Sequence, residues 1–120
     1  MKRIGLVAHD DMKDAMVAFA TAHRDRLAAF ALVGTGTTGA RVAQGTGLEI
    51  TCLKSGPLGG DAQLGSMICE GQLDALIFLI DPMSAMPHDV DIKALVRLAT
   101  LYDIPLACNK ATAEAVLAAL

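Results

Sequence analysis

Short apolar runs alternate with amphipathic segments along the whole chain. Five of the runs are continuous and short, which is typical of strands buried on both faces. We predict these strands at residues 3–8, 28–33, 48–53, 75–80 and 104–108. After each run, apolar residues recur every three to four positions, which predicts helices with one buried face. The predicted helices cover residues 12–23, a short stretch after Gly39 to about Gln44, and residues 62–70, 92–102 and 112–120.

This alternation predicts an α/β fold: a single-domain, open, parallel five-stranded sheet with helices on both faces, Rossmann-like in its arrangement. The 120 residues contain no linker, repeat or low-complexity tract, so we expect one domain over residues 1–120. Right-handed crossovers place the C-terminal end of every strand at one edge of the sheet. The polar segments at 9–10, 34–39, 55–61 and 81–91 each follow a predicted strand. We therefore expect all four on one side, where open α/β sheets bind ligands.

The most distinctive segment reads Ser-Gly-Pro-Leu-Gly-Gly-Asp, from Ser55 to Asp61. Three glycines and a proline in seven residues exclude the interior of a helix or strand. The segment joins a predicted strand to a predicted helix, where backbone N–H groups can converge on an anion. Asp61, at the edge of such a cradle, is a candidate for proton transfer with the molecule that the anion anchors.

A second glycine-rich segment, Gly34-Thr-Gly-Thr-Thr-Gly39, matches the spacing of the dinucleotide-binding fingerprint. That fingerprint also requires an acid about 20 residues later, and Lys54 occupies this place. Thr35, Thr37 and Thr38 instead supply hydroxyl groups, which suit the three oxygens of a terminal phosphate. The alternative is that these threonines only cap a turn and a helix. The sequence leaves both interpretations open.

Several charged and titratable residues flank these two segments. Lys13, three residues after Asp10, is either a solvated helix residue or a counter-charge for phosphate on the next strand. His9 ends the first strand, and His88 precedes a helix with Asp91 three residues later. Each histidine either satisfies local backbone groups or joins the acids at the rim of a common pocket. Their spacing fits no metal triad, so we expect no metal site.

Composition narrows the class of protein. Hydrophobic residues make up 53% of the chain, with a mean hydropathy of +0.46. No apolar stretch approaches the ~20 residues of a membrane span, and charged residues from Lys2 to Asp14 exclude a signal peptide. The surplus of apolar residues favours an oligomer. A net charge of −3 gives no general attraction to nucleic acid.

The three cysteines are an odd number and are widely spaced. Cys52, Cys69 and Cys108 each lie in an apolar run. This placement predicts buried thiols in a reducing cytoplasm, not disulfides or metal ligands.

Together these segments closely resemble methylglyoxal synthases, in unbroken order and spacing from residue 4 to about residue 112. The resemblance is carried by Val7–Asp10, Gly34–Gly39, Ser55–Asp61, Leu76–Pro82, and Pro87–Asp89 through Arg97–Thr100. It implies a homohexameric cytoplasmic lyase of a glycolytic bypass, which converts dihydroxyacetone phosphate (glycerone phosphate) to methylglyoxal and inorganic phosphate without metal or cofactor. Inorganic phosphate is then both product and expected inhibitor. Longer members continue beyond the position of Leu120, so contacts from that tail are not carried over.

The resemblance also implies roles for individual residues. Asp61 would be the catalytic base, and His88, Asp91 and Asp10 would complete the catalytic set. The residues implied to bind substrate are His9, Lys13, Thr35, Gly36, Thr37, Thr38, Ser55, Gly56 and His88.

The implied chemistry agrees with the residues present. Removing a proton beside a ketone needs a carboxylate base and a neutral donor at the carbonyl oxygen, and Asp61 and His88 are groups of those types. Phosphate departure needs further donors, which the threonines and Lys13 supply. The alternative is a non-catalytic regulatory module of the same fold that binds a phosphorylated effector. Such a module has no use for the acids and His88 together, so the enzyme is favoured.

Overall fold

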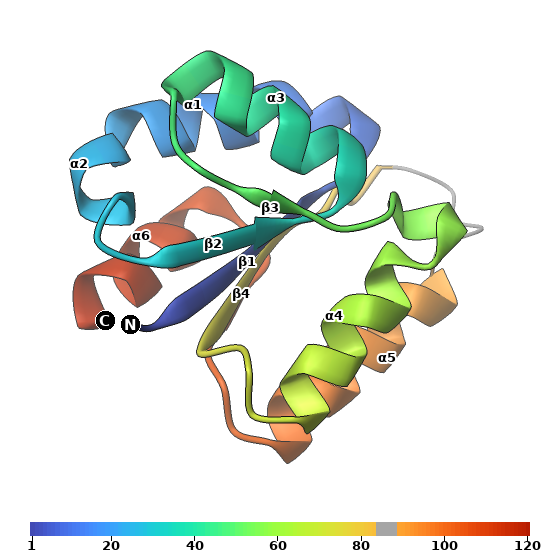
Figure 1. Ribbon diagram of the computed structural model, residues 1–120. Helices are drawn as coiled ribbons and strands as arrows, with labels where there is room; N and C mark the ends of the chain where they lie inside the picture. Colours follow the sequence, from blue (N-terminus) through green and yellow to red (C-terminus); the bar gives the residue numbers. More distant parts are fainter. Residues whose placement is uncertain (84–88) are drawn as a thin grey trace.

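The chain folds into three layers, with a parallel sheet between two layers of helices. The computed structural model describes residues 1–83 and 89–120. In that part of the chain, five parallel strands form one sheet in the order β3-β2-β1-β4-β5. The strands are β1 (Arg3–Ala8), β2 (Ala31–Gly34), β3 (Thr51–Cys52), β4 (Ala75–Leu79) and β5 (Leu106–Ala107). The predicted open five-stranded parallel sheet is confirmed (Figure 1).

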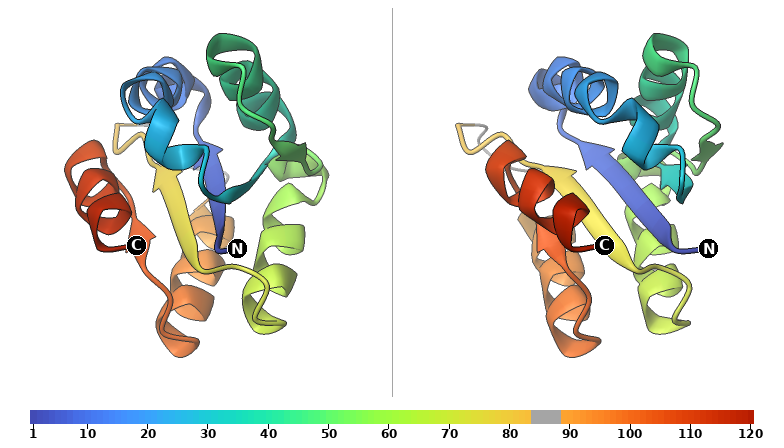
Figure 2. Two further views of the ribbon diagram at one scale, coloured as in Figure 1. Left: turned by 60° about the vertical axis from the view of Figure 1, so that its left-hand side comes forward. Right: turned by 90° about the vertical axis from the view of Figure 1, so that its left-hand side faces the viewer.

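Helices cover both faces of this sheet. They are α1 (Lys13–Ala22), α2 (Arg24–Leu27), α3 (Gly36–Thr46), α4 (Gly60–Cys69), α5 (Asp89–Leu101) and α6 (Lys110–Ala119), with short 3-10 turns η1 (Asp10–Met12) and η2 (Gly56–Leu58). Helices α1, α3 and α6 lie on one face, whereas α4 and α5 lie side by side on the other (Figures 1 and 2). No helix in the described part of the chain has the length and apolarity needed to span a bilayer.

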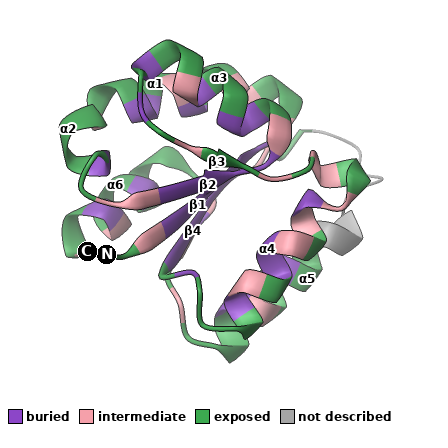
Figure 3. Ribbon diagram, in the orientation of Figure 1, coloured by how far each residue is buried: buried purple, intermediate pink, exposed green. Residues whose placement is uncertain are grey.

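Two apolar clusters hold the layers together. Successive side chains of a strand point to opposite faces, so β1 contributes Ile4 and Leu6 to one cluster and Val7 to the other. The first cluster joins the sheet to α1, α3 and α6, and the second joins it to α4 and α5. All five residues of β4 are buried, as expected for a central parallel strand (Figure 3). This burial explains the uninterrupted apolar run in the sequence.

The structure corrects three predicted strands. The second begins at Ala31 and not at residue 28, because residues 28–30 form a turn that follows the short helix α2. Leu27 anchors α2 in the core, and Arg26 Nε donates to the carbonyl of Leu117 in α6 at 2.9 Å. The strands expected over 48–53 and 104–108 shrink to two residues each. Both lie at the edges of the sheet, where a strand has only one hydrogen-bonding neighbour.

The prediction of three buried thiols is wrong for two of them. Cys52 lies on the edge strand β3 and Cys69 ends α4, and both are exposed. Cys108, after β5, is half-buried, and desolvation raises the pKa of its thiol. All three thiols are free. An apolar run therefore identified the elements that carry these residues but not the direction of each side chain.

Candidate active site

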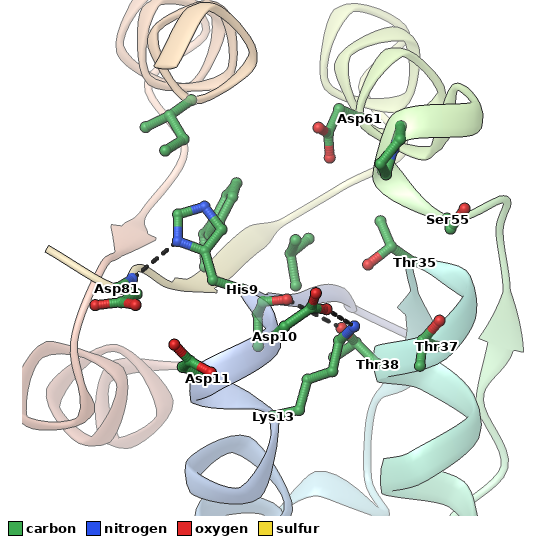
Figure 4. A pocket seen from close by; sticks show the side chains of 16 residues that line it. His9, Asp10, Asp11, Lys13, Thr35, Thr37, Thr38, Ser55, Asp61 and Asp81 are labelled. Carbon is green, nitrogen blue, oxygen red and sulfur yellow. Dashed lines mark hydrogen bonds and ion pairs between the residues drawn. The ribbon is translucent and has the colours of Figure 1, made fainter. Parts of the chain in front are cut away.

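A cavity of about 530 Å³ opens at the C-terminal edge of the sheet. Its walls come from the segments that follow β1, β2, β3 and β4, together with the first turns of α1, α3 and α4 (Figure 4). Its volume lies within the range of small-molecule sites. The lining residues are Val7, Ala8, His9, Asp10, Asp11, Lys13, Thr35, Thr37, Thr38, Ser55, Gly56, Pro57, Asp61, Phe78, Asp81 and Ile92. The expected convergence of these segments at one edge is therefore confirmed.

The segment Gly34–Gly39, hereafter the threonine turn, forms one wall. Thr35 is the N-cap residue of α3, but no side chain caps this helix by a hydrogen bond. Thr38 is buried and donates to the carbonyl of Ala8 at 3.4 Å, whereas Thr37 is exposed. The interpretation that the threonines only cap the helix is thus not supported. Hydroxyls and the positive end of the α3 dipole instead face the cavity, an arrangement suited to an anion.

Gly36 does not have the place that the sequence analysis expected. Its backbone N–H donates to the carbonyl of Lys54 at 3.2 Å, and it is not among the described residues that line the cavity. A Cβ at this position would lie 3.1 Å from the backbone nitrogen of Ser55. Gly36 therefore joins the threonine turn to the next turn of the site, and its amide is not available to a ligand in this arrangement.

The segment Ser55–Asp61, hereafter the base turn, forms the neighbouring wall. Its backbone folds on itself through hydrogen bonds from the N–H groups of Leu58 and Gly60 to the carbonyl of Ser55, at 3.0 and 2.9 Å. Gly59 has a φ of +110°, a conformation that favours glycine. Asp61 follows at the start of α4 and lines the cavity.

The carboxylate of Asp61 lies next to Gly56. A Cβ on Gly56 would be 3.3 Å from Oδ2 and 3.4 Å from Oδ1 of Asp61. The absence of a side chain at residue 56 leaves this side of the carboxylate uncrowded. Figure 4 shows this carboxylate directed into the cavity that Asp61 lines.

His9 presents one ring nitrogen to the interior. Its Nδ1 accepts the backbone N–H of Asp81 at 2.9 Å, so in the neutral ring the proton is on Nε2. Nε2 is buried and has no hydrogen-bond partner among the described residues. The ring packs edge-on against Phe78, with centroids 5.3 Å apart. A buried donor without an acceptor is costly, and here it borders the cavity, where a ligand oxygen can satisfy it.

Lys13 supplies the positive charge of the site. Its side chain is 13% exposed, and Nζ lies 2.6 Å from Oδ1 of Asp10, whose side chain is 93% exposed. Figure 4 shows Lys13 directed toward Asp10 and the threonine turn. The interpretation of Lys13 as a solvated surface residue is therefore wrong. The partner that keeps Lys13 in this direction is the neighbouring acid.

Two of the expected residues are not placed. His88 lies outside the described residues, and although Asp91 belongs to α5, its side chain is also outside the described part. Conversely, Asp81 and Phe78 line the cavity and were not singled out from the sequence. The position of Asp81 two residues after the end of β4, at the same edge as His9, is a signal that could have identified it. Among the described residues, no group of three potential metal ligands occurs.

Comparison with known proteins agrees with this geometry. Residues 15–108 match the MGS-like domain family. The methylglyoxal synthase of Agrobacterium fabrum is 62% identical over 112 residues, covering 92% of this chain and 88% of that protein. The methylglyoxal synthase of Brucella anthropi is 58% identical over 119 residues, covering 98% and 95%.

The fold also matches a solved structure. The crystal structure of methylglyoxal synthase from Elizabethkingia anophelis matches with a TM-score of 0.91 at 48% identity, covering 97% of this chain and 76% of that chain. Sequence and structure thus agree over almost the entire chain. The chain belongs to the methylglyoxal synthase family.

Proposed function

We propose that this chain is a phosphate-eliminating carbon–oxygen lyase that converts dihydroxyacetone phosphate to methylglyoxal and inorganic phosphate. The observation that carries the proposal is the pairing, across one cavity, of the Asp61 carboxylate with the threonine turn and Lys13. One wall offers a proton acceptor, and the other offers hydroxyls and a positive charge. Family membership supports the same reaction.

In the proposed first step, Asp61 takes a proton from the hydroxymethyl carbon beside the ketone. The electron pair of the broken C–H bond moves onto the carbonyl oxygen and forms an enediolate. A neutral hydrogen-bond donor stabilises the negatively charged enediolate oxygen more than the neutral carbonyl oxygen of the substrate. The donor therefore lowers the activation free energy of proton removal. The buried Nε2–H of His9 is such a donor. It acts beside the role that the resemblance implies for His88, which lies outside the described residues.

In the second step, an electron pair of the hydroxyl oxygen forms the aldehyde C=O bond, the enediolate double bond shifts toward the phosphate-bearing carbon, and the carbon–oxygen bond to the phosphate breaks. The phosphate leaves with the proton of that hydroxyl, and the enolate that remains becomes methylglyoxal when its terminal CH2 carbon takes up the proton that Asp61 removed. The departing phosphate gains negative charge, and Lys13 and the hydroxyls of Thr35 and Thr37 stabilise this charge by charge-assisted hydrogen bonds. The hydroxyl of Thr38 already donates to the carbonyl of Ala8 and supports the turn. The reaction changes no net oxidation state, so it needs no redox cofactor.

A direct assay tests this function. Purified protein is incubated with dihydroxyacetone phosphate, and the dicarbonyl product and free phosphate are measured by colorimetry. We expect the two products in equal amounts, and their formation about 10²–10⁴-fold slower with Asp61→Asn. Binding of the substrate without either product would instead support the regulatory module of the same fold.

We also propose that inorganic phosphate inhibits by occupying the phosphate place of the substrate. The threonine turn and Lys13 offer it the same donors. Inhibition by millimolar phosphate is expected to be competitive, with the effect lost at saturating substrate. A rate that is insensitive to phosphate would contradict this placement.

Finally, we propose a homohexamer in the cytoplasm. Several large apolar side chains are exposed on the single chain, among them Leu58, Met83 and Leu101. Their contact with further copies would remove them from water. Sedimentation is expected to give six times the chain mass of 12.5 kDa, and a monomer at micromolar concentration would contradict it.

A further inference from the structure

Both turns of the candidate site contact Lys54. The carbonyl of Lys54 accepts the backbone N–H of Gly36, the first residue of α3. On the other side, Gly60 packs so closely on this carbonyl that a Cβ would lie 1.9 Å from the oxygen. The carbonyl of Lys54 therefore contacts both turns and helps to fix their relative position.

A side chain of α4 holds the remaining backbone group of Lys54. The N–H of Lys54 donates to Oε1 of Gln63 at 2.9 Å. Because the partner is an N–H group, the acceptor must be the amide oxygen of Gln63. The preceding strand β3 is an edge strand, and no second strand pairs with its outer side in the described part of the chain. The side chain of Gln63, on α4, thus accepts the hydrogen bond that a neighbouring strand would otherwise accept from the Lys54 N–H.

The hydrogen bond between Gln63 and Lys54 also affects Asp61, because both side chains belong to the first turn of α4. Gln63 and Asp61 are two residues apart in the first turn of α4, so they point roughly 200° apart around the helix. One side chain reaches Lys54 while the other faces the cavity. The two glycines before Asp61, Gly59 and Gly60, leave the entry to α4 with little intrinsic stiffness. The position of the first turn of α4 therefore depends on its contacts with the rest of the protein, and the hydrogen bond of Gln63 to Lys54 is one of these contacts.

We propose that Gln63 is a positioning residue for the proton transfer: it keeps Asp61 at a set place relative to the threonine turn by holding Lys54. The proposal rests on the proposed function, in which Asp61 is the base. A displacement of about 1 Å in such a pair costs up to about 10²-fold in rate. The proposed phosphate donors, Lys13 and the threonines, lie at the starts of α1 and α3 and not on α4, so substrate affinity is expected to change little.

Two substitutions separate positioning from general structure. Gln63→Met keeps the length of the side chain but removes the oxygen, and Gln63→Glu restores an oxygen acceptor. Gln44→Met, at an exposed position on α3, is the matched control. We expect Gln63→Met to lower kcat about tenfold to hundredfold while KM, phosphate inhibition and Tm remain close to wild type. Gln63→Glu is expected to recover most of kcat, and Gln44→Met to have no effect.

Amide hydrogen exchange measured by NMR gives a readout independent of turnover. The N–H of Lys54 is expected to be protected in the wild type and in Gln63→Glu, and to exchange faster in Gln63→Met. A wild-type kcat for Gln63→Met, or a Gln63→Glu variant as slow as Gln63→Met, would overturn the positioning role while the reaction stands. A wild-type protein that forms no methylglyoxal would overturn the proposed function, and the catalytic role of Gln63 with it.

Discussion

The threonine turn and the base turn look alike in sequence but use their glycines differently. In the threonine turn, a Cβ on Gly34 would lie 2.9 Å from Cα of Gly39, so glycine there allows β2 and α3 to pack closely. In the base turn, Gly59 adopts a left-handed conformation and Gly60 packs onto Lys54. The threonine turn packs closely and positions hydroxyl groups, whereas the base turn positions the carboxylate of Asp61 at the cavity. Glycine spacing alone does not distinguish these tasks.

The comparison predicts that changes in the base turn lower turnover, whereas changes in the threonine turn and at Lys13 weaken binding. Asp61→Asn carries the largest expected effect. Asparagine keeps the size of the side chain but cannot accept the proton, so kcat is expected to fall by ~10²–10⁴ with phosphate affinity retained. Proton exchange at the hydroxymethyl carbon, followed by NMR in heavy water, checks the step directly. Near-normal exchange in this variant, with loss of exchange in Asp10→Asn or Asp91→Asn, would assign the base elsewhere.

Gly60→Ala tests the packing of the base turn. A Cβ at 1.9 Å from the Lys54 carbonyl cannot be accommodated without moving the backbone. We expect a loss of about 2–4 kcal/mol in the free energy of unfolding, measured by urea denaturation. Gly59→Ala is the matched variant, because its Cβ would have no atom within 4 Å, so the only cost is the strained φ of +110°. Equal losses in the two variants would contradict the importance of the Lys54 contact.

Lys13→Met tests the charge on the phosphate side of the cavity. Methionine keeps most of the apolar stem but removes a charge that contributes about 1.5–3 kcal/mol per hydrogen bond. We expect the KM for substrate and the inhibition constant of phosphate to rise together by about tenfold to hundredfold. Steady-state kinetics with and without phosphate measure both. Loss of leaving-group stabilisation can lower kcat as well, but a change in kcat without a change in either constant would contradict the role of Lys13 in binding.

Thr37→Val has the smallest expected effect. The substitution preserves shape and removes one exposed hydroxyl of the threonine turn. One neutral hydrogen bond contributes about 0.5–1.5 kcal/mol, so the inhibition constant of phosphate is expected to rise about twofold to tenfold. Titration with phosphate measures it, and Thr21→Val on the outer surface of α1 serves as the control. An unchanged constant would mean that this hydroxyl does not contact the phosphate.

Local patterns were sufficient to predict the order of the strands and of every helix except the short α2, because periodicity reflects which faces are buried. They also predicted that the segments after β1, β2, β3 and β4 share one edge, since parallel strands joined by right-handed crossovers have no other arrangement. The threonine turn and Asp61 were therefore expected at one edge from the sequence alone, whereas the residue patterns left the roles of Lys13 and the threonines open. Turn composition located them, and topology brought them together.

Tertiary contacts decided the rest. The lengths of β3 and β5 depend on having one neighbour instead of two, and the exposure of Cys52 depends on that edge position. The proton of His9 is placed by a backbone N–H at Asp81, 72 residues away. The amide of Gly36 is used by Lys54, and Lys54 in turn is held by Gln63. The sequence by itself determined which chemical groups meet at the sheet edge. Only the tertiary structure decided which of their donors and acceptors are already paired, because that depends on hydrogen bonds between segments far apart in the chain.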